Sequence, residues 1–380
     1  MKIGLFVDAK KMCHNTLNFF VISVEKVLRQ HGVQTELIAK ISGDIIHQQF
    51  DAFIGFNRPE PALQSDDGRF LLDILNIPFF NVIVDPPYYH YRSLKSHAEE
   101  LHLIFVDKGH VKYCEKYYMP CKSIEMGYLL GPIGNRISYE ERTIDILFTG
   151  SCSNYDVIKA DILSDKYPAE MQDVFLYLVD AGIKNPQKTT EELVLSYLYT
   201  STNQIEVDVF NFIMNRIGTW AEFYLRGYYR EKIIRLLVEA GLRITIAGTG
   251  WDRIFPECPA NLTLLGEIDM LRTADLTANA KILLNVMPWF KDGLHDRIPT
   301  AMHNGAVCVT DSSSYIDEHF ISNENIVIYR LAELDSLPNK CKYLLDHPKE
   351  AGKIAQAGQH KAELEYTWEH FVNNYILKWL

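Results

Sequence analysis

The feature that most constrains the fold is a regular alternation between short apolar runs and segments with helical periodicity. A continuous apolar run of strand length is typical of a parallel strand buried on both faces, because helices cover both sides of such a sheet. In the first part of the chain these runs occupy residues 2–9, 33–39, 50–57, 77–87, 101–107 and 123–132. Residues 19–32 and 66–76, which lie between runs, have helical spacing. The pattern predicts a doubly wound, Rossmann-like α/β domain.

The same alternation starts again after a short break. Gly131-Pro132-Ile133-Gly134 is rich in residues that interrupt regular structure, which indicates a linker. Beyond it, apolar runs occupy residues 144–154, 243–253, 260–268, 281–288, 306–309 and 325–330. A chain of 380 residues is also too long for one ordinary hydrophobic core. We therefore expect a first domain at residues 1–131, a second at residues 140–365, and a C-terminal helix at residues 366–380.

Residues 155–241 interrupt the second alternation, because their periodicity is helical almost throughout. Helices this apolar must pack against something, so the segment predicts a helical insertion within the second domain or a cap over it. Arg226 and Arg230 lie four residues apart and so share one helical face. The two side chains could reach a diphosphate, but their spacing favours a solvent-exposed helix face.

The composition argues against several classes of protein. With 47% hydrophobic and 23% charged residues, the chain is typical of globular proteins. A formal net charge of -11 without any basic run argues against nucleic acid as a partner. No run reaches the roughly 18 apolar residues of a transmembrane helix. Residues 1–9 also lack the layout of a signal peptide, so we expect a cytoplasmic protein.

The seven cysteines are an odd number and include no CxxC pair. Zinc sites and disulfide frameworks need closer or paired spacings, so we expect reduced, mainly structural thiols. Cys13 is followed by His14, which leaves a catalytic cysteine open, although adjacent side chains seldom face each other.

Two loops that follow predicted strands of the first domain carry titratable side chains. Residues 8–15 contain Asp8 and His14, and residues 84–93 contain Asp85 and His90. Because the carboxyl ends of parallel strands meet at one edge of a sheet, we expect these groups to lie near one another. Either type of side chain could act as a general base toward a hydroxyl. Ordinary turn formation at Asp85 and its two following prolines is the alternative.

The stretch from Trp289 to Asp317 combines a polar loop, a short helix, a glycine stop and a buried strand. His295, Asp296 and Arg297 stand just ahead of the helix, at a predicted strand end. A helix N-terminus beside an arginine suits a phosphate group. The alternative is that the three residues only cap a surface helix.

Known nucleotide motifs are not matched elsewhere. The turn at residues 248–251 lacks the third glycine of a dinucleotide fingerprint, and no GxxxxGK[ST] run is present. Bound NAD and a P-loop are therefore not expected. Gly150 and Ser151 follow a strand, where backbone N–H groups could approach an anion closely.

Together, several of these segments resemble the second domain of two-domain GT-B glycosyltransferases. The segments are residues 248–251, 261–268, 283–288, 296–311 and 366–377. The similarity is strongest to the CgeB-like branch, the spore-maturation type with a "glycosyl transferases group 1" domain. Residues 83–94, 105–118 and 126–132 resemble the N-terminal domain of that branch. The resemblance implies two Rossmann-like domains that face each other across a cleft, with a terminal helix that crosses back to the first.

The resemblance also implies binding roles. A nucleotide-diphosphate sugar donor is expected in the second domain, and an acceptor, which could be a glycan, a protein or a small molecule, mainly in the first. Donor-binding residues are then expected at Gly150, Ser151, Arg230, Gly248, Gly250, Trp251, His295, Asp296, Arg297, Thr300, Asn304, Gly305, Thr310 and Asp311. Thr300 departs from the related pattern, which has a ribose-binding glutamate at this position. Ribose recognition here comes from Asp296 instead, or is absent.

The expected mechanism needs neither a metal nor a cofactor. Arg297 and Arg230 could stabilise the charge of a departing diphosphate, and no DxD loop for a divalent ion is present. Inversion at the sugar would need an acceptor-side base, for which His14 and Asp85 are the candidates; retention would need none. A non-catalytic nucleotide-sugar or glycan-binding protein and a nucleotide-sugar epimerase are the two alternatives to a transferase.

Overall fold

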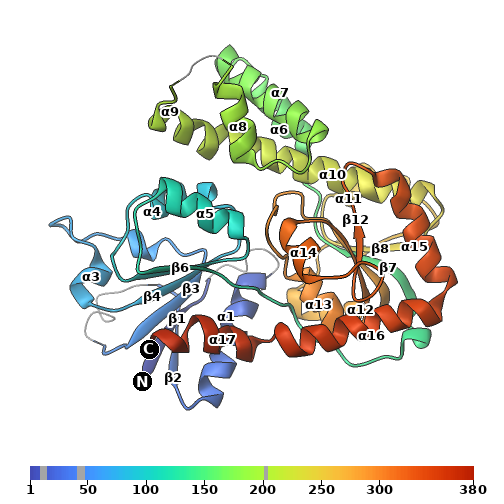
Figure 1. Ribbon diagram of the computed structural model, residues 1–380, viewed down its shortest axis with the longest axis horizontal. Helices are drawn as coiled ribbons and strands as arrows, with labels where there is room; N and C mark the ends of the chain where they lie inside the picture. The colour runs from blue at the N-terminus through green and yellow to red at the C-terminus, as the bar shows by residue number, and fades with distance from the viewer. Residues whose placement is uncertain (9–14, 41–47, 201–203) are drawn as a thin grey trace.

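Two six-stranded parallel sheets, each flanked by helices, form the computed structural model, which describes residues 1–8, 15–40, 48–200 and 204–380 (Figure 1). The strands of the first sheet are β1 (Lys2–Phe6), β2 (Gln34–Ile38), β3 (Ala52–Phe56), β4 (Phe79–Ile83), β5 (Leu101–Phe105) and β6 (Ser123–Met126). Those of the second are β7 (Ile144–Thr149), β8 (Ile244–Ala247), β9 (Leu262–Leu264), β10 (Ala280–Asn285), β11 (Val307–Asp311) and β12 (Val327–Tyr329). The expected α/β fold with two doubly wound domains is therefore confirmed.

The strand order places the candidate loops. It is β2-β1-β3-β4-β5-β6 in the first sheet and β12-β11-β10-β7-β8-β9 in the second. In the second sheet β7 and β10 are neighbours, with Leu147 opposite Leu283, although β8 and β9 separate them in sequence. The chain order reverses at this point, and ligands bind in the crevice beyond such a reversal in open α/β sheets.

Helices flank both sheets. Those of the first domain are α1 (Thr16–Gln30), α3 (Leu71–Leu75), α4 (Tyr91–Leu94) and α5 (Lys108–Tyr117). Those that follow β8 are α11 (Trp251–Ile254), α12 (Thr273–Ala278), α13 (Arg297–His303), α14 (Ser314–His319), α15 (Leu337–Asp346), α16 (Pro348–Glu365) and α17 (Trp368–Tyr375). All five residues of β3, β4, β5 and β11 are buried, which explains why these segments read as continuous apolar runs.

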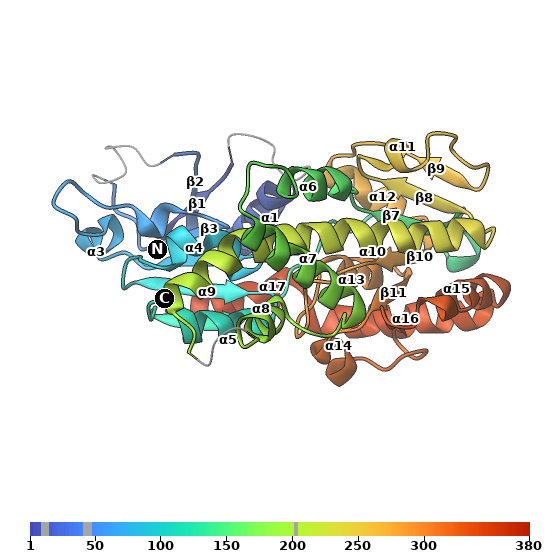
Figure 2. The same ribbon diagram turned by 90° about the horizontal axis from the view of Figure 1, so that it is seen from above.

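The helical insertion lies above both domains in the view of Figure 1, and Figure 2 shows it from above. It consists of α6 (Tyr155–Ile162), α7 (Ala169–Lys184), α8 (Thr190–Leu198), α9 (Val207–Phe212), the π-helical segment η5 (Ile213–Gly218) and the long α10 (Thr219–Glu239). Its core includes Phe175, Val194 and Met214, and the same cluster takes in Tyr88 and Tyr113 of the first domain. The insertion is thus packed against both halves of the molecule.

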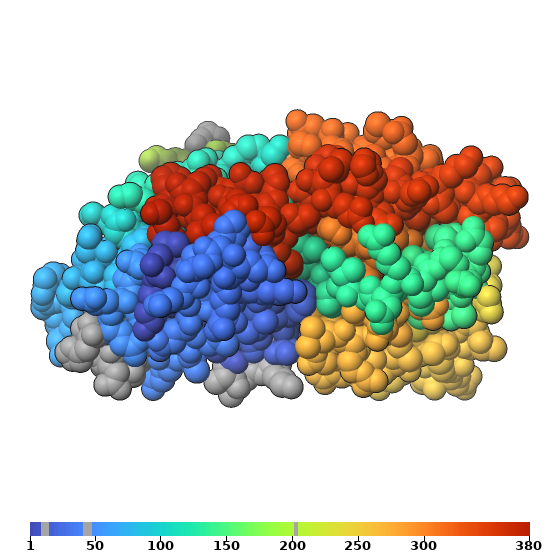
Figure 3. Space-filling view, turned by 90° about the horizontal axis from the view of Figure 1, so that it is seen from below, coloured from blue at the N-terminus to red at the C-terminus, as the bar shows by residue number. Residues whose placement is uncertain are grey.

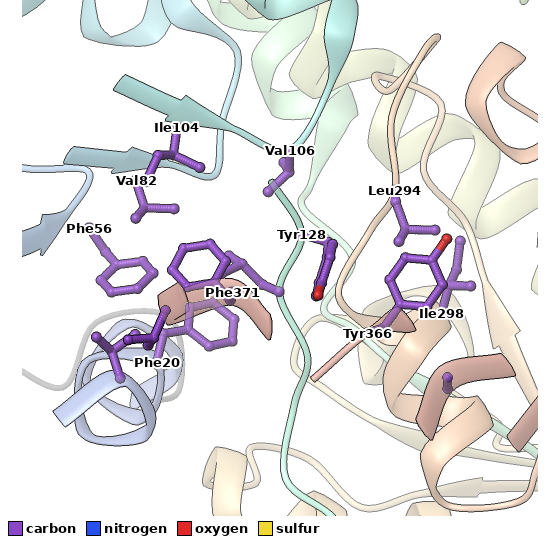
Figure 4. Close-up of a cluster of buried hydrophobic side chains, with 14 of the residues drawn as sticks. Phe20, Phe56, Val82, Ile104, Val106, Tyr128, Leu294, Ile298, Tyr366 and Phe371 are labelled. Atoms are coloured by element: carbon purple, nitrogen blue, oxygen red, sulfur yellow. The ribbon is translucent and has the colours of Figure 1, made fainter. Parts of the chain in front are cut away.

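The C-terminal segment runs across the molecule from the second domain onto the first (Figure 3). α17 packs against α1 there, with Phe371 fully buried. Phe20 on α1 and Ile298 on α13 belong to the same hydrophobic cluster as Phe371, so one core joins the two domains (Figure 4). Among the described residues, no helix combines the length and apolarity needed to cross a bilayer.

Candidate functional site

A cavity of about 370 Å³ opens where the carboxyl ends of the two sheets face each other. The loops after β7, β8 and β10 form its second-domain wall, the loops after β3 and β4 its first-domain wall, and α10 contributes two arginines. Of the residues expected from the sequence, the cavity brings together Asp85, Gly150, Ser151, Arg230, Gly248, His295, Asp296, Arg297 and Thr300. Residues that are remote in sequence are therefore gathered by the strand order described above.

Arg297 is held in place from the end of β10. The side chain is 9% exposed, and its Nη1 donates to Asn285 Oδ1 at 2.6 Å. Asn285 in turn donates from Nδ2 to Thr310 Oγ1 at 2.9 Å. Thr310 thus supports the site through Asn285 and is not part of the cavity wall. Sequence reasoning missed Asn285, whose signal is an amide at the end of an otherwise apolar strand.

His295, Asp296 and Arg297 form a connected group. His295 Nδ1 lies 2.6 Å from Asp296 Oδ1, and Arg297 Nη2 lies 3.1 Å from His295 Nε2. The Arg297 backbone N–H also lies 3.3 Å from Nδ1, so it is the shorter contact with the carboxylate that favours a neutral imidazole with its proton on Nδ1, whose Nε2 then accepts from the guanidinium. Burial, aided by the positive charge of Arg297, lowers the pKa of His295 to about 4. Burial alone raises the pKa of Asp296, but His295 and Arg297 bring that pKa below its ordinary value.

Arg230 carries a buried charge with few partners. Its Nη1 donates to the Ser151 carbonyl at 2.6 Å, while its buried Nε has no hydrogen-bond partner among the described residues. Burial, together with Arg297 and Arg226, lowers the pKa of Arg230 to about 9. Within the described ranges, no carboxylate lies at ion-pairing distance from Arg230 or Arg297. Two neighbouring guanidinium groups that no carboxylate contacts at ion-pairing distance make this part of the cavity suitable for an anion.

Arg226 adds a third guanidinium to the wall of the cavity. It lies over the ring of Trp289, 3.8 Å from the ring centroid, and pairs with Glu222 at 3.2 Å. Its other carboxylate neighbour is Asp85, at 3.8 Å. The prediction of a solvent-exposed face for Arg226 and Arg230 is therefore wrong, because packing of α10 over the cleft leaves both side chains only partly exposed, in the wall of the cavity.

The first domain contributes Asp85 and Asn57 to the cavity. Asn57 Nδ2 donates to Asp85 Oδ2 at 2.9 Å, which fixes the carboxylate at the end of β4. Asp8 instead pairs with Arg58 at 2.7 Å, and burial lowers the pKa of His90. His14 lies outside the described residues. Asp85 is thus the expected acceptor-side candidate that the structure places in the cavity.

Some expected donor residues have structural positions away from the cavity. Trp251 is 1% exposed, packs edge-on against Phe148, and donates from Nε1 to the Gly150 carbonyl at 2.8 Å. Gly250 starts α11 with φ of 83°, a conformation that favours glycine. Gly250 and Trp251 therefore shape the loop after β8 without lining the cavity.

Asn304 and Gly305 lie at the opposite end of α13, just before β11, and not in the wall of the cavity. Asn304 Oδ1 accepts from the Gly134 backbone N–H at 2.8 Å, so Asn304 binds the interdomain linker. Thr300 lines the cavity, but its hydroxyl accepts from the Gly131 N–H at 2.5 Å and donates to the Asp296 carbonyl at 2.6 Å. The polar groups of both side chains are thus engaged within the protein.

Asp311 faces a separate cavity of about 350 Å³ beside the loop after β11. Its Oδ1 accepts from the Met287 N–H at 2.9 Å, and burial raises its pKa to about 7. In the part of the chain that the structure describes, no group of three or more His, Cys, Asp or Glu side chains could hold a metal ion.

The chain is similar to a known protein family in part of its sequence and to solved structures in its whole fold. Residues 230–376 match the family model described as glycosyl transferase-like. No curated protein matches the chain in sequence. HepE of Anabaena, solved in complex with UDP-glucose, has a similar fold with a TM-score of 0.54 and 11% identity, and the match covers 100% of both chains. HepE in complex with UDP and glucose gives a TM-score of 0.53, again with 11% identity over 100% of both chains. The chain thus has the two-domain GT-B fold, and the sequence match to the glycosyl transferase-like family model is confined to residues 230–376.

Proposed function

We propose that the protein is a glycosyltransferase that moves a sugar from a nucleotide-diphosphate donor to an acceptor hydroxyl. The observation that carries this proposal is the convergence of Arg226, Arg230 and Arg297 on one cavity at the reversal point of the second sheet. Two of these cations lack a carboxylate partner among the described residues, so a bound diphosphate would neutralise them. HepE, which has a similar fold, was solved with UDP-glucose, which supports a donor of this chemical class. The CgeB-like branch is the subfamily that we propose.

The chemistry follows from the charges in the cavity. Negative charge develops on the diphosphate as the sugar departs, and preoriented guanidinium groups stabilise it most strongly where water is excluded. We propose that these groups supply the stabilisation without a metal. Asp85 stands on the facing wall, where it could accept the proton of an acceptor hydroxyl if the reaction inverts the anomeric centre. A glycan, protein or small-molecule acceptor would then enter from the first domain.

Binding of nucleoside diphosphates and nucleotide sugars tests the proposal directly. A ligand at about 100 times its Kd stabilises the folded state by roughly 2.7 kcal/mol, which thermal unfolding detects. We expect stabilisation of the wild type by one nucleotide class, and loss of that effect in Arg297→Ala. Arg235→Ala is the control arginine, because Arg235 lies on α10 outside the cavity, where it pairs with Glu231. No stabilisation of the wild type by any nucleotide would contradict the proposed function.

A transfer assay then separates a transferase from its alternatives. Release of nucleoside diphosphate that depends on an added acceptor indicates transfer. An altered sugar without an acceptor indicates an epimerase, and binding without turnover indicates a non-catalytic binding protein. In Asp85→Asn, an inverting enzyme should lose most of its turnover while it keeps donor affinity.

A further inference from the structure

The helical insertion reaches the first domain through a buried carboxylate. Glu222 on α10 is 4% exposed and accepts hydrogen bonds from three hydroxyl groups. Tyr89 donates at 2.7 Å and Thr190 at 3.3 Å, and the Tyr88 hydroxyl is the third donor. Both tyrosines belong to the first domain, in the turn Pro87–His90 after β4. Burial raises the pKa of both, so each keeps its proton and remains a donor.

The same carboxylate also holds Arg226. Arg226 Nη2 donates to Glu222 Oε1, which is the oxygen that accepts from Tyr89. On its other side the guanidinium lies against the Trp289 ring of the second domain. Its Nε is buried and has no hydrogen-bond partner among the described residues, although the side chain lines the cavity. Arg226 is therefore fixed where the insertion, the first domain and the second domain meet.

We propose that docking of the first domain completes the diphosphate site, because Tyr88 and Tyr89 position Glu222 and thereby Arg226. This inference rests on the proposed function of the cavity. Without the hydroxyl donors of Tyr88 and Tyr89, the Glu222 carboxylate loses hydrogen bonds that fix it, and the Glu222–Arg226 pair is no longer held beside the cavity. Tyr88 and Tyr89 are positioning residues in this scheme, since they act on the anion through Glu222 and Arg226.

Tyr89→Phe tests this coupling, because it removes one hydroxyl from the first domain and leaves every arginine intact. With inorganic pyrophosphate and with UDP-glucose as probes in calorimetry, we expect a Kd about tenfold weaker for both. Tyr117→Phe is the matched control. The Tyr117 hydroxyl donates to Glu191 at 2.6 Å across the same interface, away from Arg226. Its loss should leave both Kd values within about twofold.

A double-mutant cycle distinguishes positioning from a general loosening of the interface. If Tyr89 acts through Arg226, Tyr89→Phe should change neither Kd once Arg226→Ala is present. The effect of Tyr89→Phe on both Kd values is also measured in Arg226→Lys, which retains a cation beside Glu222. Equal weakening by Tyr117→Phe, or additive effects of Tyr89→Phe and Arg226→Ala, would overturn the inference and leave the proposed function standing. A wild type that binds neither probe would overturn the proposed function and the inference together.

Discussion

At the scale of single residues, His295 makes the stability of the folded protein depend on pH. Its pKa is lowered from 6.5 to about 4 in the folded state. Between these two values the unfolded chain binds the proton and the folded chain does not, so a falling pH favours unfolding. The contribution of the neutral imidazole is fully present above pH 6.5 and is lost as the pH falls to about 4.

We therefore expect the stability of the wild type relative to His295→Gln to fall by about 2 kcal/mol between pH 7 and pH 5. Urea unfolding of both proteins at the two pH values measures this difference, and comparison of the pair cancels the titration of other groups. His360→Gln, at an exposed position of α16, is the control for the substitution itself. If the difference in unfolding free energy between wild type and His295→Gln is the same at both pH values, the imidazole has the same pKa in the folded and the unfolded state.

At the scale of elements, α13 is fastened to the interdomain linker. Thr300 binds the backbone of Gly131, and Asn304 binds the backbone of Pro132 and Gly134. These bonds explain why a hydroxyl and an amide follow each other at one-turn spacing on this helix. They also explain why the fold accommodates a threonine at position 300, where the related pattern has a glutamate. The Thr300 hydroxyl accepts a hydrogen bond from the linker backbone.

Thr300→Val should consequently lower stability by about 1–3 kcal/mol, since it leaves a buried backbone N–H without an acceptor. The affinity for UDP-glucose should change little. Chemical unfolding and calorimetry on the same preparations measure both quantities. Thr263→Val, at an exposed position of β9, is the control and should shift stability by less than about 0.5 kcal/mol. Weaker donor binding with unchanged stability would instead indicate that Thr300 contacts the donor.

At the scale of the whole molecule, one hydrophobic cluster joins the two sheets. It contains Leu5 of β1, Leu283 of β10 and Phe371 of α17. The C-terminal helix therefore shares apolar burial with both domains, and the relative position of the domains depends on it. Arg226 depends on the same relative position, because its partners come from both sides of the cleft.

Phe371→Ala should cost about 3–5 kcal/mol, as expected for removal of a fully buried aromatic side chain. Thermal and urea unfolding measure the loss. Leu364→Ala is the control, since that side chain is 65% exposed and should contribute little. A loss below about 1 kcal/mol in Phe371→Ala would mean that neighbouring side chains fill the space left by the ring. In that case α17 is not needed to join the domains.

Much of the fold and part of the site could be predicted from local patterns. Buried strands such as β3, β4 and β5 read as continuous apolar runs, and the alternation of strand-like with helical segments made the less buried β2, β6 and β9 recognisable as well. Loops at strand ends pointed to Asp85 and Arg297, both of which line the cavity. Asn285 and Glu222 escaped notice, because an amide or a carboxylate inside a regular element has no local signal for its distant partner.

The sequence by itself determined the class of fold, since the spacing of apolar residues records which faces of each strand and helix are buried. Only the tertiary structure decided which side chains share the cavity. The order of strands brings the loops after β7 and β10 together, and the packing of α10 over the cleft places Arg226 and Arg230 in the cavity wall. The same packing directs Asn304 to the linker and Trp251 to the core. Contacts between residues remote in sequence depend on strand order and domain packing, which local periodicity does not encode.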